Sequence, residues 1–441
     1  MTPTSPNRRS ALVGAGAALV AGAGGVLIGR STAGDDAVTT SAAASATGTT
    51  SSSAGTSANQ PIFGTSTASP ARTRTQLTDG LFVLSGIIGY GQATVLVDND
   101  GTQRGEIVTT AQTAAQVPIP VGGRILTTVG PSALGVIQPT GFLWRIIDLG
   151  RYTVHHDVHA VGDTAYVLAT DSSSDRTTVQ DVVLVVDVPT GEITRVIDMT
   201  KVLPTYLETT HAREGQDKND CLHLNSVDVV DDTVYLSSRE TSTIIALDGA
   251  TGAGTGTGTG TGTPTIRYLI GASNIWEGTG YESKFLTKTT NFSEDAGQHS
   301  LQRLDAPSLA DGQYYLEMFN NNLWYMGTRD DVSTMGPAKA STSETTGASE
   351  ILRYLVDENE GTVAEAARVD VPYSSVMSDA LRIRSDDERD TDDGTLSDHL
   401  VVCSAKARVF SERTSAGEVI AQYRADSPTG VYRVYKDSFT G

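Results

Sequence analysis

Seven histidines occur in the 441-residue chain, and five of them stand in three short phrases. The phrases are HHDVH at 155–159, CLHLNS at 221–226 and GQHS at 297–300. Each phrase comes just before a turn and a strand signal, so each takes an equivalent place in its own structural unit. Imidazole has a usual pKa of about 6.5 and can act as nucleophile, proton donor or anion ligand near neutral pH. The three phrases therefore mark a candidate site.

Strand alternation helps to choose between neighbouring residues in these phrases. His156 shares a face with the apolar residues of its strand, so we expect His156, rather than His155, to point inward. By the same count His223 and Asn225 share one face. Arg239 ends the strand that follows, in SSR at 237–239, and returns near the same end. The alternation thus predicts a cluster of imidazole rings with one guanidinium.

A lone histidine is most often a core residue with a satisfied hydrogen bond, but three in matched positions beside an arginine favour a site. Three histidines could hold zinc, although an arginine at the same place would repel the cation. A cluster of histidine and arginine without obvious carboxylate partners suits an oxyanion better. We therefore expect an oxyanion substrate, with neither a metal nor a cofactor.

The elements that must position these residues are short strands in a repeated order: an apolar strand, an acidic turn, another strand. Examples are VLVDNDGTQRGEIV at 95–108, LVVDVPTGEITRVI at 184–197 and IIALDGATG at 244–252. Such repeats are typical of propeller blades, and the length allows about six blades. Equivalent places on different blades then meet at the central channel. We predict an all-β fold, a six-bladed β-propeller over residues 75–441, with a pair of β-sandwiches as the alternative.

The N-terminal segment is an expected export signal or membrane anchor. Arg8 and Arg9 precede an uncharged stretch at 10–29, long enough to cross a bilayer core. The arginine pair resembles a twin-arginine signal. Residues 31–74 are rich in Ser, Thr, Ala and Gly and predict a disordered linker. We expect residues 1–30 to direct the protein to the cell surface or exterior, either cleaved or kept as an anchor.

The formal charge of −20 argues against a nucleic-acid partner, because binding a polyanion requires clustered Lys and Arg. A carboxylate-rich surface also favours adaptation to high salt, and a GC-rich genome is the alternative explanation of the composition. Cys221 and Cys403 could form one disulfide, but nothing in the sequence brings them together. Oligomeric state leaves no signal in the sequence.

At the histidine phrases the chain resembles the arylsulfate sulfotransferases, which use phenolic sulfate esters rather than a nucleotide donor. The resemblance covers about residues 80–437. It rests on five phrases in order: HHD at 155–157, HLNS at 223–226, SSR at 237–239, QH at 298–299 and FNN at 319–321. Two departures alter the pocket wall: the family's usual Trp before H-x-N is replaced around 220–222, and its F-D-N reads FNN here.

This resemblance implies a six-bladed propeller that transfers a sulfuryl group by a ping-pong mechanism through a sulfurylated histidine. It implies His299 as the nucleophile. His156, His223 and Arg239 match the residues that hold the sulfuryl oxygens and protonate the leaving phenolate. The substrate-binding positions it implies are Asn225, His155 and Asn321. The substrates would be an aryl sulfate donor and a phenol acceptor.

Three alternatives remain at this point. A non-catalytic propeller that displays a binding surface outside the cell does not require histidines and an arginine at the channel mouth. A lactonase-like propeller would need inward carboxylates around a calcium ion, whereas the carboxylates here stand mostly at turns. An aryl sulfate hydrolase could use the same site, because water can compete for the sulfurylated histidine.

Overall fold

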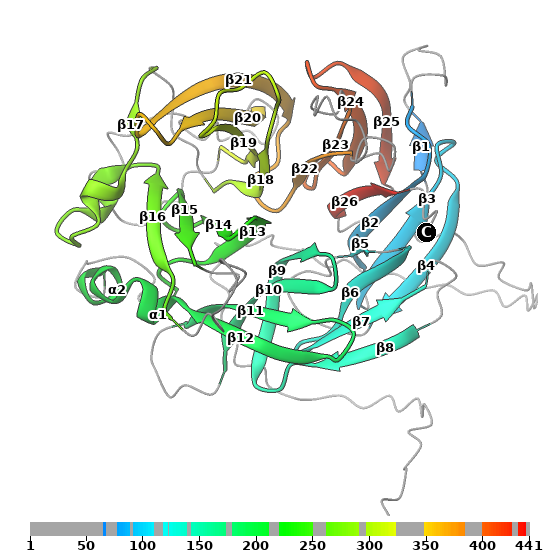
Figure 1. The fold of residues 1–441 in the computed structure, drawn as a ribbon. Helices are drawn as coiled ribbons and strands as arrows, with labels where there is room; N and C mark the ends of the chain where they lie inside the picture. Colours follow the sequence, from blue (N-terminus) through cyan, green and yellow to red (C-terminus); the bar gives the residue numbers. More distant parts are fainter. Residues whose placement is uncertain are drawn as a thin grey trace, which may run out of the picture. The chain divides into compact units, whose positions relative to one another are not determined.

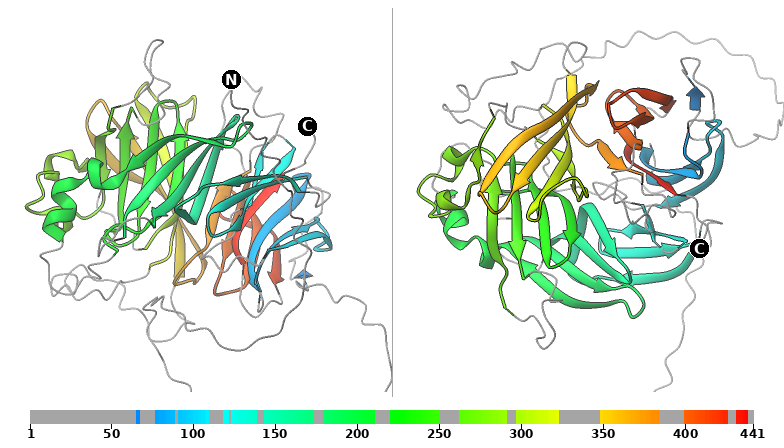
Figure 2. Two further views of the ribbon diagram at one scale, coloured as in Figure 1. Left: turned by 90° about the horizontal axis from the view of Figure 1, so that it is seen from below. Right: turned by 45° about the horizontal axis from the view of Figure 1, so that its top comes forward.

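Six β-sheets make up the fold in the computed structural model. The structure describes residues 65–67, 77–88, 91–109, 118–121, 123–138, 143–172, 179–210, 220–249, 262–290, 297–322, 348–383, 399–425 and 431–437. The sheets follow one another around a ring, each with one strand at the centre (Figures 1 and 2). The fold is thus a six-bladed β-propeller, as the sequence predicted.

The blades are numbered here in the chain order of their second strands, counted from the axis. Blade 1 joins the two ends of the ring: the last strand, β26 (Val431–Asp437), lies innermost and pairs with β2 (Leu81–Ile88), followed outward by β3 (Gly91–Val97) and β4 (Gln103–Thr109). Such a closure ties the start of the described domain to its end by main-chain hydrogen bonds.

Blades 2 to 4 are four-stranded meanders, each given from the axis outward. Blade 2 contains β5 (Ile119–Val121), β6 (Arg124–Gly130), β7 (Ala133–Ile137) and β8 (Leu143–Asp148). Blade 3 contains β9 (Tyr152–Val161), β10 (Thr164–Asp171), β11 (Asp181–Asp187) and β12 (Glu192–Asp198). Blade 4 contains β13 (Leu224–Val230), β14 (Thr233–Ser238), β15 (Thr243–Asp248) and β16 (Thr265–Ile270).

Blades 5 and 6 each carry a fifth, outermost strand. Blade 5 contains β18 (His299–Leu304), β19 (Gln313–Asn320), β20 (Ala348–Asp357), β21 (Thr362–Pro372) and β17 (Thr287–Lys288). Blade 6 contains β22 (Asp379–Arg382), β23 (His399–Ser404), β24 (Val409–Thr414), β25 (Val419–Ala425) and β1 (Thr65–Thr67). β1 pairs with β25, so strand pairing reaches into the segment 31–74 expected to be a linker.

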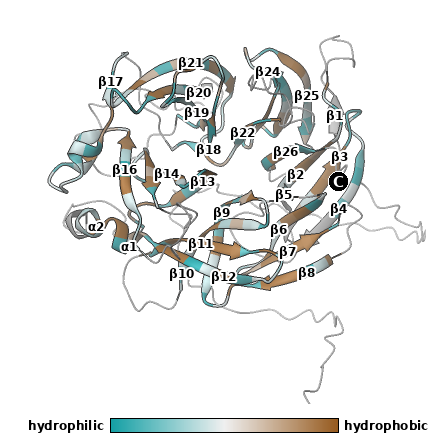
Figure 3. Ribbon diagram, in the orientation of Figure 1, coloured by the Kyte–Doolittle hydropathy of each residue, from teal (hydrophilic) through white to brown (hydrophobic). Residues whose placement is uncertain are grey.

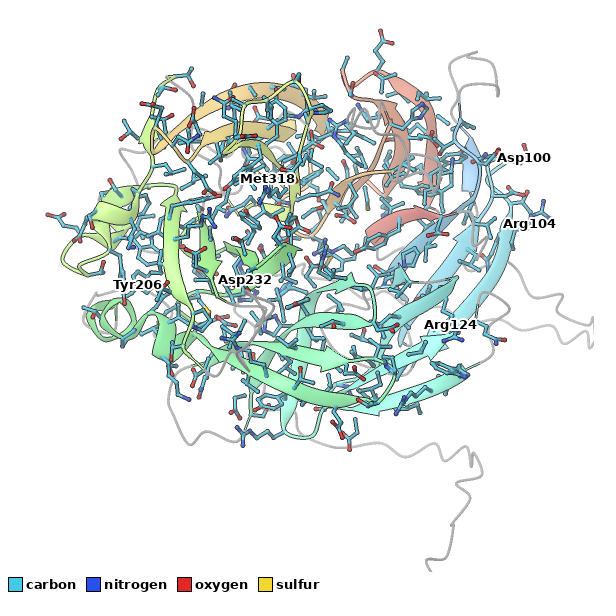
Figure 4. All side chains as sticks on the ribbon, viewed as in Figure 1. Asp100, Arg104, Arg124, Tyr206, Asp232 and Met318 are labelled. Carbon is cyan, nitrogen blue, oxygen red and sulfur yellow. The ribbon has the colours of Figure 1, made fainter. Side chains whose placement is uncertain are left out.

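The apolar runs quoted from the sequence become the third strand, counted from the axis, of blades 1, 3 and 4. β11, with the sequence DVVLVVD, is buried from Asp181 to Val186 because the neighbouring blades cover both of its faces. The outer strand β12 alternates between exposed and partly buried residues. Brown colour extends along much of blades 2 and 3, including the outermost strand β8, where Leu143, Trp144 and Ile146 are exposed (Figure 3). At the outer rim, Asp100 and Arg104 point away from the axis (Figure 4).

A small helical layer covers the outside of blade 4 (Figure 1). It consists of α1 (Met199–Val202), α2 (Pro204–Thr210) and the 3₁₀ turns η2 (Ser273–Trp276) and η3 (Glu282–Lys284). The rings of Tyr206 and Trp276 lie 4.2 Å apart at the centre of this layer and are fully buried. The layer seals the outer edge of blade 4, which lies between the blades that carry His156 and His299.

The expected signal or anchor at 1–30 and most of the linker at 31–74 lie outside the described residues. Among the helices that the structure describes, none is both long and apolar enough to cross a membrane. Cys221 and Cys403 are buried and are not joined by a disulfide. Cys403 Sγ instead donates a hydrogen bond to the carbonyl of Val431.

Candidate active site

The three histidine phrases come together at the axis, because each stands at the start of an innermost strand or within it. His156 belongs to β9, His223 precedes β13 directly, and His299 begins β18. The ring of His156 lies 4.7 Å from that of His223 and 6.3 Å from that of His299, measured between centroids. Residues that are 143 positions apart in sequence (299 − 156) thus share one site.

His299 has a defined protonation state. Its Nδ1 lies 2.9 Å from the carbonyl oxygen of Gly297 and 2.7 Å from Oδ1 of Asn321, and both partners are acceptors. Nδ1 must therefore carry the proton, which leaves a lone pair on Nε2. Burial, together with the charges of Arg433 and Arg239, lowers the pKa of His299 to about 3. The imidazole is consequently neutral near pH 7.

His156 and His223 share a hydrogen bond between their Nε2 atoms, at 2.7 Å. The outer nitrogen of each ring is also bound: Nδ1 of His156 lies 2.9 Å from the Tyr432 hydroxyl, and Nδ1 of His223 donates to the Asp220 carboxylate. Burial, followed by the charges of nearby cationic groups, holds the pKa of His156 well below its usual value. The four side chains form a continuous hydrogen-bonded chain beside His299.

The alternation expected along these strands is broken where the site lies. Val158 pairs with Val167 and Val154 pairs with Ala169, so residues 155–157 face a single residue of β10. Similar register shifts occur at the start of β13 and of β18. His156 and His223 have φ values of 56° and 50°, in the left-handed region that costs a non-glycine residue about 1–3 kcal/mol. Each bulge lets adjacent side chains both point toward the axis, which strict alternation forbids.

The second inward residue of each bulge bonds to the next blade. In four successive blades a polar side chain accepts a hydrogen bond from the backbone N–H of the neighbouring inner strand. The pairs, acceptor first, are Asp157 Oδ2 with Val227 N (3.0 Å), Ser226 Oγ with Leu301 N (2.8 Å), Ser300 Oγ with Ala380 N (3.1 Å) and Asp379 Oδ2 with Val434 N (3.3 Å). We call these residues, with Arg433, the axial belt.

Arg433 closes the axial belt across the centre of the ring. Its guanidinium lies 3.2 Å from Asp379 and 3.4 Å from Asp157, and it donates to the carbonyls of His156 and Asn225. The side chain is only 1% exposed. Burial raises the pKa of Asp379 to about 6, against the attraction of Arg433. Arg433 thus holds the backbone beneath the histidines from two blades at once.

Arg239 follows β14 and reaches the same end of the channel. Its backbone N–H donates to the carbonyl of His223 at 3.2 Å, which fixes the two strand ends to each other. Its guanidinium pairs with Glu240 at 2.5 Å, and its charge lowers the pKa of both His156 and His299. Arg239 therefore lies close enough for its charge to act on both rings, but it is paired with a carboxylate, which the sequence analysis did not expect.

The implied substrate-binding residues have different surroundings. Asn225 is fully buried and donates from Nδ2 to the carbonyl of Gln298 at 2.7 Å, while its Oδ1 has no hydrogen-bond partner among the described residues. Asn321 accepts from His299 and donates to the carbonyls of Ser374 and Met377. His155 lies 3.4 Å from Asp181. In this structure Asn321 therefore orients the imidazole of His299.

Below the axial belt the channel continues as a separate chamber. Its volume is about 210 Å³, and its lining includes Asp157, His159, Asp228, Gln302 and Arg433. These residues belong to the belt or follow it on the inner strands, whereas His156 and His299 precede it. The belt therefore separates this chamber from the histidine cluster.

The buried, neutral His299 makes stability depend on pH. The unfolded chain binds a proton at this histidine below pH 6.5, whereas the folded protein does so only near pH 3. The contribution of His299 to the free energy of unfolding therefore falls as the pH falls. The stability advantage of the wild type over His299→Asn should shrink by about 2 kcal/mol between pH 7.5 and pH 5. Urea unfolding of both proteins at the two pH values measures this; a constant difference would contradict a buried neutral ring.

Sequence reasoning missed Asp220, Tyr432 and the axial belt. A signal for the belt does exist: HDV at 156–158, NSV at 225–227, HSL at 299–301, SDA at 378–380 and YRV at 432–434 repeat one pattern. In each triplet a polar or aromatic residue precedes a belt residue and an apolar residue. Asp220 stands three residues before His223, a spacing that a bend in the chain turns into contact.

Comparison with solved structures finds many proteins of similar but distant shape. A protein of unknown function from Bacteroides caccae has 10% identity and a TM-score of 0.43, over 81% of this chain and 98% of the other. A candidate 6-phosphogluconolactonase from Bacteroides fragilis NCTC 9343 has 14% identity and a TM-score of 0.39, over 82% and 99%. None of the curated proteins matches this sequence.

A family comparison is more specific than these structural ones. The profile described as Arylsulfotransferase (ASST) matches residues 66–435. The match runs from within β1 to within β26, so it covers every blade and every residue of the histidine cluster. The resemblance found at the five phrases is thereby confirmed over most of the chain. This chain belongs to the arylsulfotransferase family.

Proposed function

We propose that this protein transfers a sulfuryl group from a phenolic sulfate ester to a phenol, through a covalent intermediate on His299. The observation that carries the proposal is the hydrogen bonding of His299. Two acceptors hold the proton on Nδ1, so the Nε2 lone pair is available in a ring that stays neutral near pH 7. A buried neutral imidazole of fixed tautomer is a suitable nucleophile.

In the first step Nε2 of His299 attacks sulfur, and the bond from sulfur to the aryl oxygen breaks. The electron pair of that bond goes to the aryl oxygen, which takes the proton held between His156 and His223. In the second step an acceptor phenol returns a proton to the same pair and attacks sulfur. The electrons of the N–S bond then return to Nε2, so the enzyme ends in its starting state.

The charges of the site suit this reaction. Sulfuryl transfer resembles phosphoryl transfer in spreading negative charge over three equatorial oxygens, which favours fixed cationic donors over covalent help. Arg239 supplies a permanent positive charge close enough to lower the pKa of His299. The donor is a monoanion, so one arginine and one protonated histidine can balance the charge that develops.

The proposed function is tested by measuring the transfer of the sulfuryl group from a donor to an acceptor. The full chain is incubated with 4-nitrophenyl sulfate, alone and with phenol, while nitrophenol and phenyl sulfate are both followed. We expect nitrophenol release that depends on phenol, an equal amount of phenyl sulfate, and parallel lines in double-reciprocal plots because the two substrates react in separate steps.

Two other results would decide against transfer. Release of nitrophenol and sulfate without phenol would identify a hydrolase at the same site. No release from folded protein, at low or at molar salt, would favour a non-catalytic binding propeller. High salt belongs in the test because, at 1 M, the Debye length is about 3 Å and the −20 charge no longer repels the anionic donor.

A further inference from the structure

Asp220 is a carboxylate at a position where the sequence departs from the family pattern, and its side chain ends in the site. Its Oδ2 accepts the Nδ1 proton of His223, while its Oδ1 is buried without a hydrogen-bond partner in the described part of the chain. The side chain is 22% exposed, so the carboxylate lies at the wall of the site rather than in the core. Asp220 is therefore committed to one partner, His223.

The charges of Asp220 and His156, the two hydrogen-bond partners of His223, indicate what the contact between Asp220 and His223 does. Burial alone would raise the pKa of Asp220, but the hydrogen bond and charge of His223 hold it below its usual value, so the group is a carboxylate. His156 is kept neutral by burial and by its cationic neighbours. A carboxylate that accepts from Nδ1 stabilises positive charge on the imidazole ring that it binds, and in this hydrogen-bonded chain that ring is His223.

We propose that Asp220 is a positioning residue that holds the ring of His223 through its Nδ1–H. It stabilises the cationic ring that donates the Nε2 proton, shared in this structure with His156, to the aryl oxygen that leaves sulfur. This rests on the sulfuryl transfer proposed above. In the first step the Nε2–H bond breaks and an O–H bond forms on the departing phenol, while the Nδ1–H bond to Asp220 is kept. His223 becomes neutral and regains the proton from the acceptor phenol.

Other titratable groups face this pair and have to be considered in any pH profile. His155 and His156 lie beside His223 in blade 3, with ring centroids 6.4 and 4.7 Å away. The remaining neighbours, which act through charge or through the chain of hydrogen bonds, are Arg239, His299, Asp181 and Tyr432. For this reason the test depends on the leaving group and not on pH alone.

The proposed role of Asp220 also predicts which aryl sulfates can serve as sulfuryl donors. A nitrophenolate leaves without a proton, whereas an unsubstituted phenol, with a pKa of about 10, leaves slowly as an anion. A protonated His223 therefore extends the reaction to sulfates of ordinary, unactivated phenols. General acid help of this kind contributes about 10²–10⁴-fold.

The experiment compares Asp220→Asn with the wild type on two donors, 4-nitrophenyl sulfate and phenyl sulfate, with a naphthol as common acceptor. The measured quantity is kcat/KM for the donor, which reports the first transfer step. We expect Asp220→Asn to lose about 100-fold with phenyl sulfate and less than about 5-fold with 4-nitrophenyl sulfate. Asp181→Asn, which removes a buried carboxylate beside His155 instead, should leave the ratio between the two donors unchanged.

Each outcome decides the assignment. Equal losses with both donors would overturn it and reduce Asp220 to a structural residue. Asp220→Ala provides the second variant: added formate should restore activity toward phenyl sulfate but not alter that toward 4-nitrophenyl sulfate, and a lack of rescue would count against the assignment. A wild-type protein that is inactive with both donors would overturn the proposed function itself, and this inference with it.

Discussion

Replacing His299 with asparagine should reduce sulfuryl transfer by about 10⁴-fold or more, while the protein stays folded. Asparagine can still offer hydrogen-bonding groups beside Gly297 and Asn321, but it has no lone pair able to form a stable N–S bond. Loss of a covalent nucleophile removes the entire two-step route, and comparable losses follow removal of nucleophiles elsewhere. The measurement is the initial rate of transfer from 4-nitrophenyl sulfate to phenol.

The matched control is His159→Asn, at a histidine of the same inner strand as His156 that lines the chamber below the axial belt. It should keep most of the activity, because the belt separates it from the site. Trapping the wild type with donor alone should yield a sulfurylated peptide that contains residue 299, absent from His299→Asn. Activity within about tenfold of wild type in His299→Asn would refute the covalent role.

Replacing Arg433 with methionine should destabilise the fold by about 3–5 kcal/mol, the largest loss of stability expected from a single site. The guanidinium is buried and bound to Asp157 and Asp379, and no other cation pairs with either carboxylate among the described contacts. Methionine leaves both carboxylates buried without a counter-charge. Unfolding by urea, followed by tryptophan fluorescence, measures the loss.

The pH dependence of this variant gives a second readout. Without Arg433 the pKa of each carboxyl group in the folded protein rises further above its unfolded value, so the folded state binds more protons than the unfolded state. Stability is then lost as the pH rises, and the defect should be larger at pH 8 than at pH 5. Arg413→Met is the control, because Arg413 is as buried but donates to neutral groups, Ser411 and Gly417. An equal, pH-independent loss in both variants would contradict the ionic role of Arg433.

Much of the fold follows from the sequence, because each blade repeats the same local pattern. Apolar runs such as VVLVVD predict strands that are covered on both faces, and the acidic turns between runs predict hairpins. The match between the hairpins that begin at His156 and at Asn225 places them in equivalent strands of successive blades, and the structure has both innermost. The histidine cluster could be predicted for the same reason.

The rest of the site depends on geometry that a strand pattern cannot reveal. Alternation predicts that Asp157 points away from His156, yet the bulge turns both toward the axis. Tyr432 meets His156 only because the last strand returns to complete blade 1, a contact between residues 276 positions apart. Asp220 lies in no strand, and its contact with His223 depends on the bend before β13. Register shifts also occur in the outer strand pairs, but those at the site ends of β9, β13 and β18 are the ones that place the histidines.

The axial belt has a consequence for how substrates reach the histidine cluster and leave it. Because Arg433 and its partners lie across the axis between the histidines and the chamber, we expect substrates to reach the cluster from the opposite end. In the proposed reaction, the phenol that leaves and the phenol that accepts the sulfuryl group would then pass through the same opening, one after the other. We therefore expect the first phenol to leave before the acceptor binds, which agrees with the separate steps of the proposed reaction.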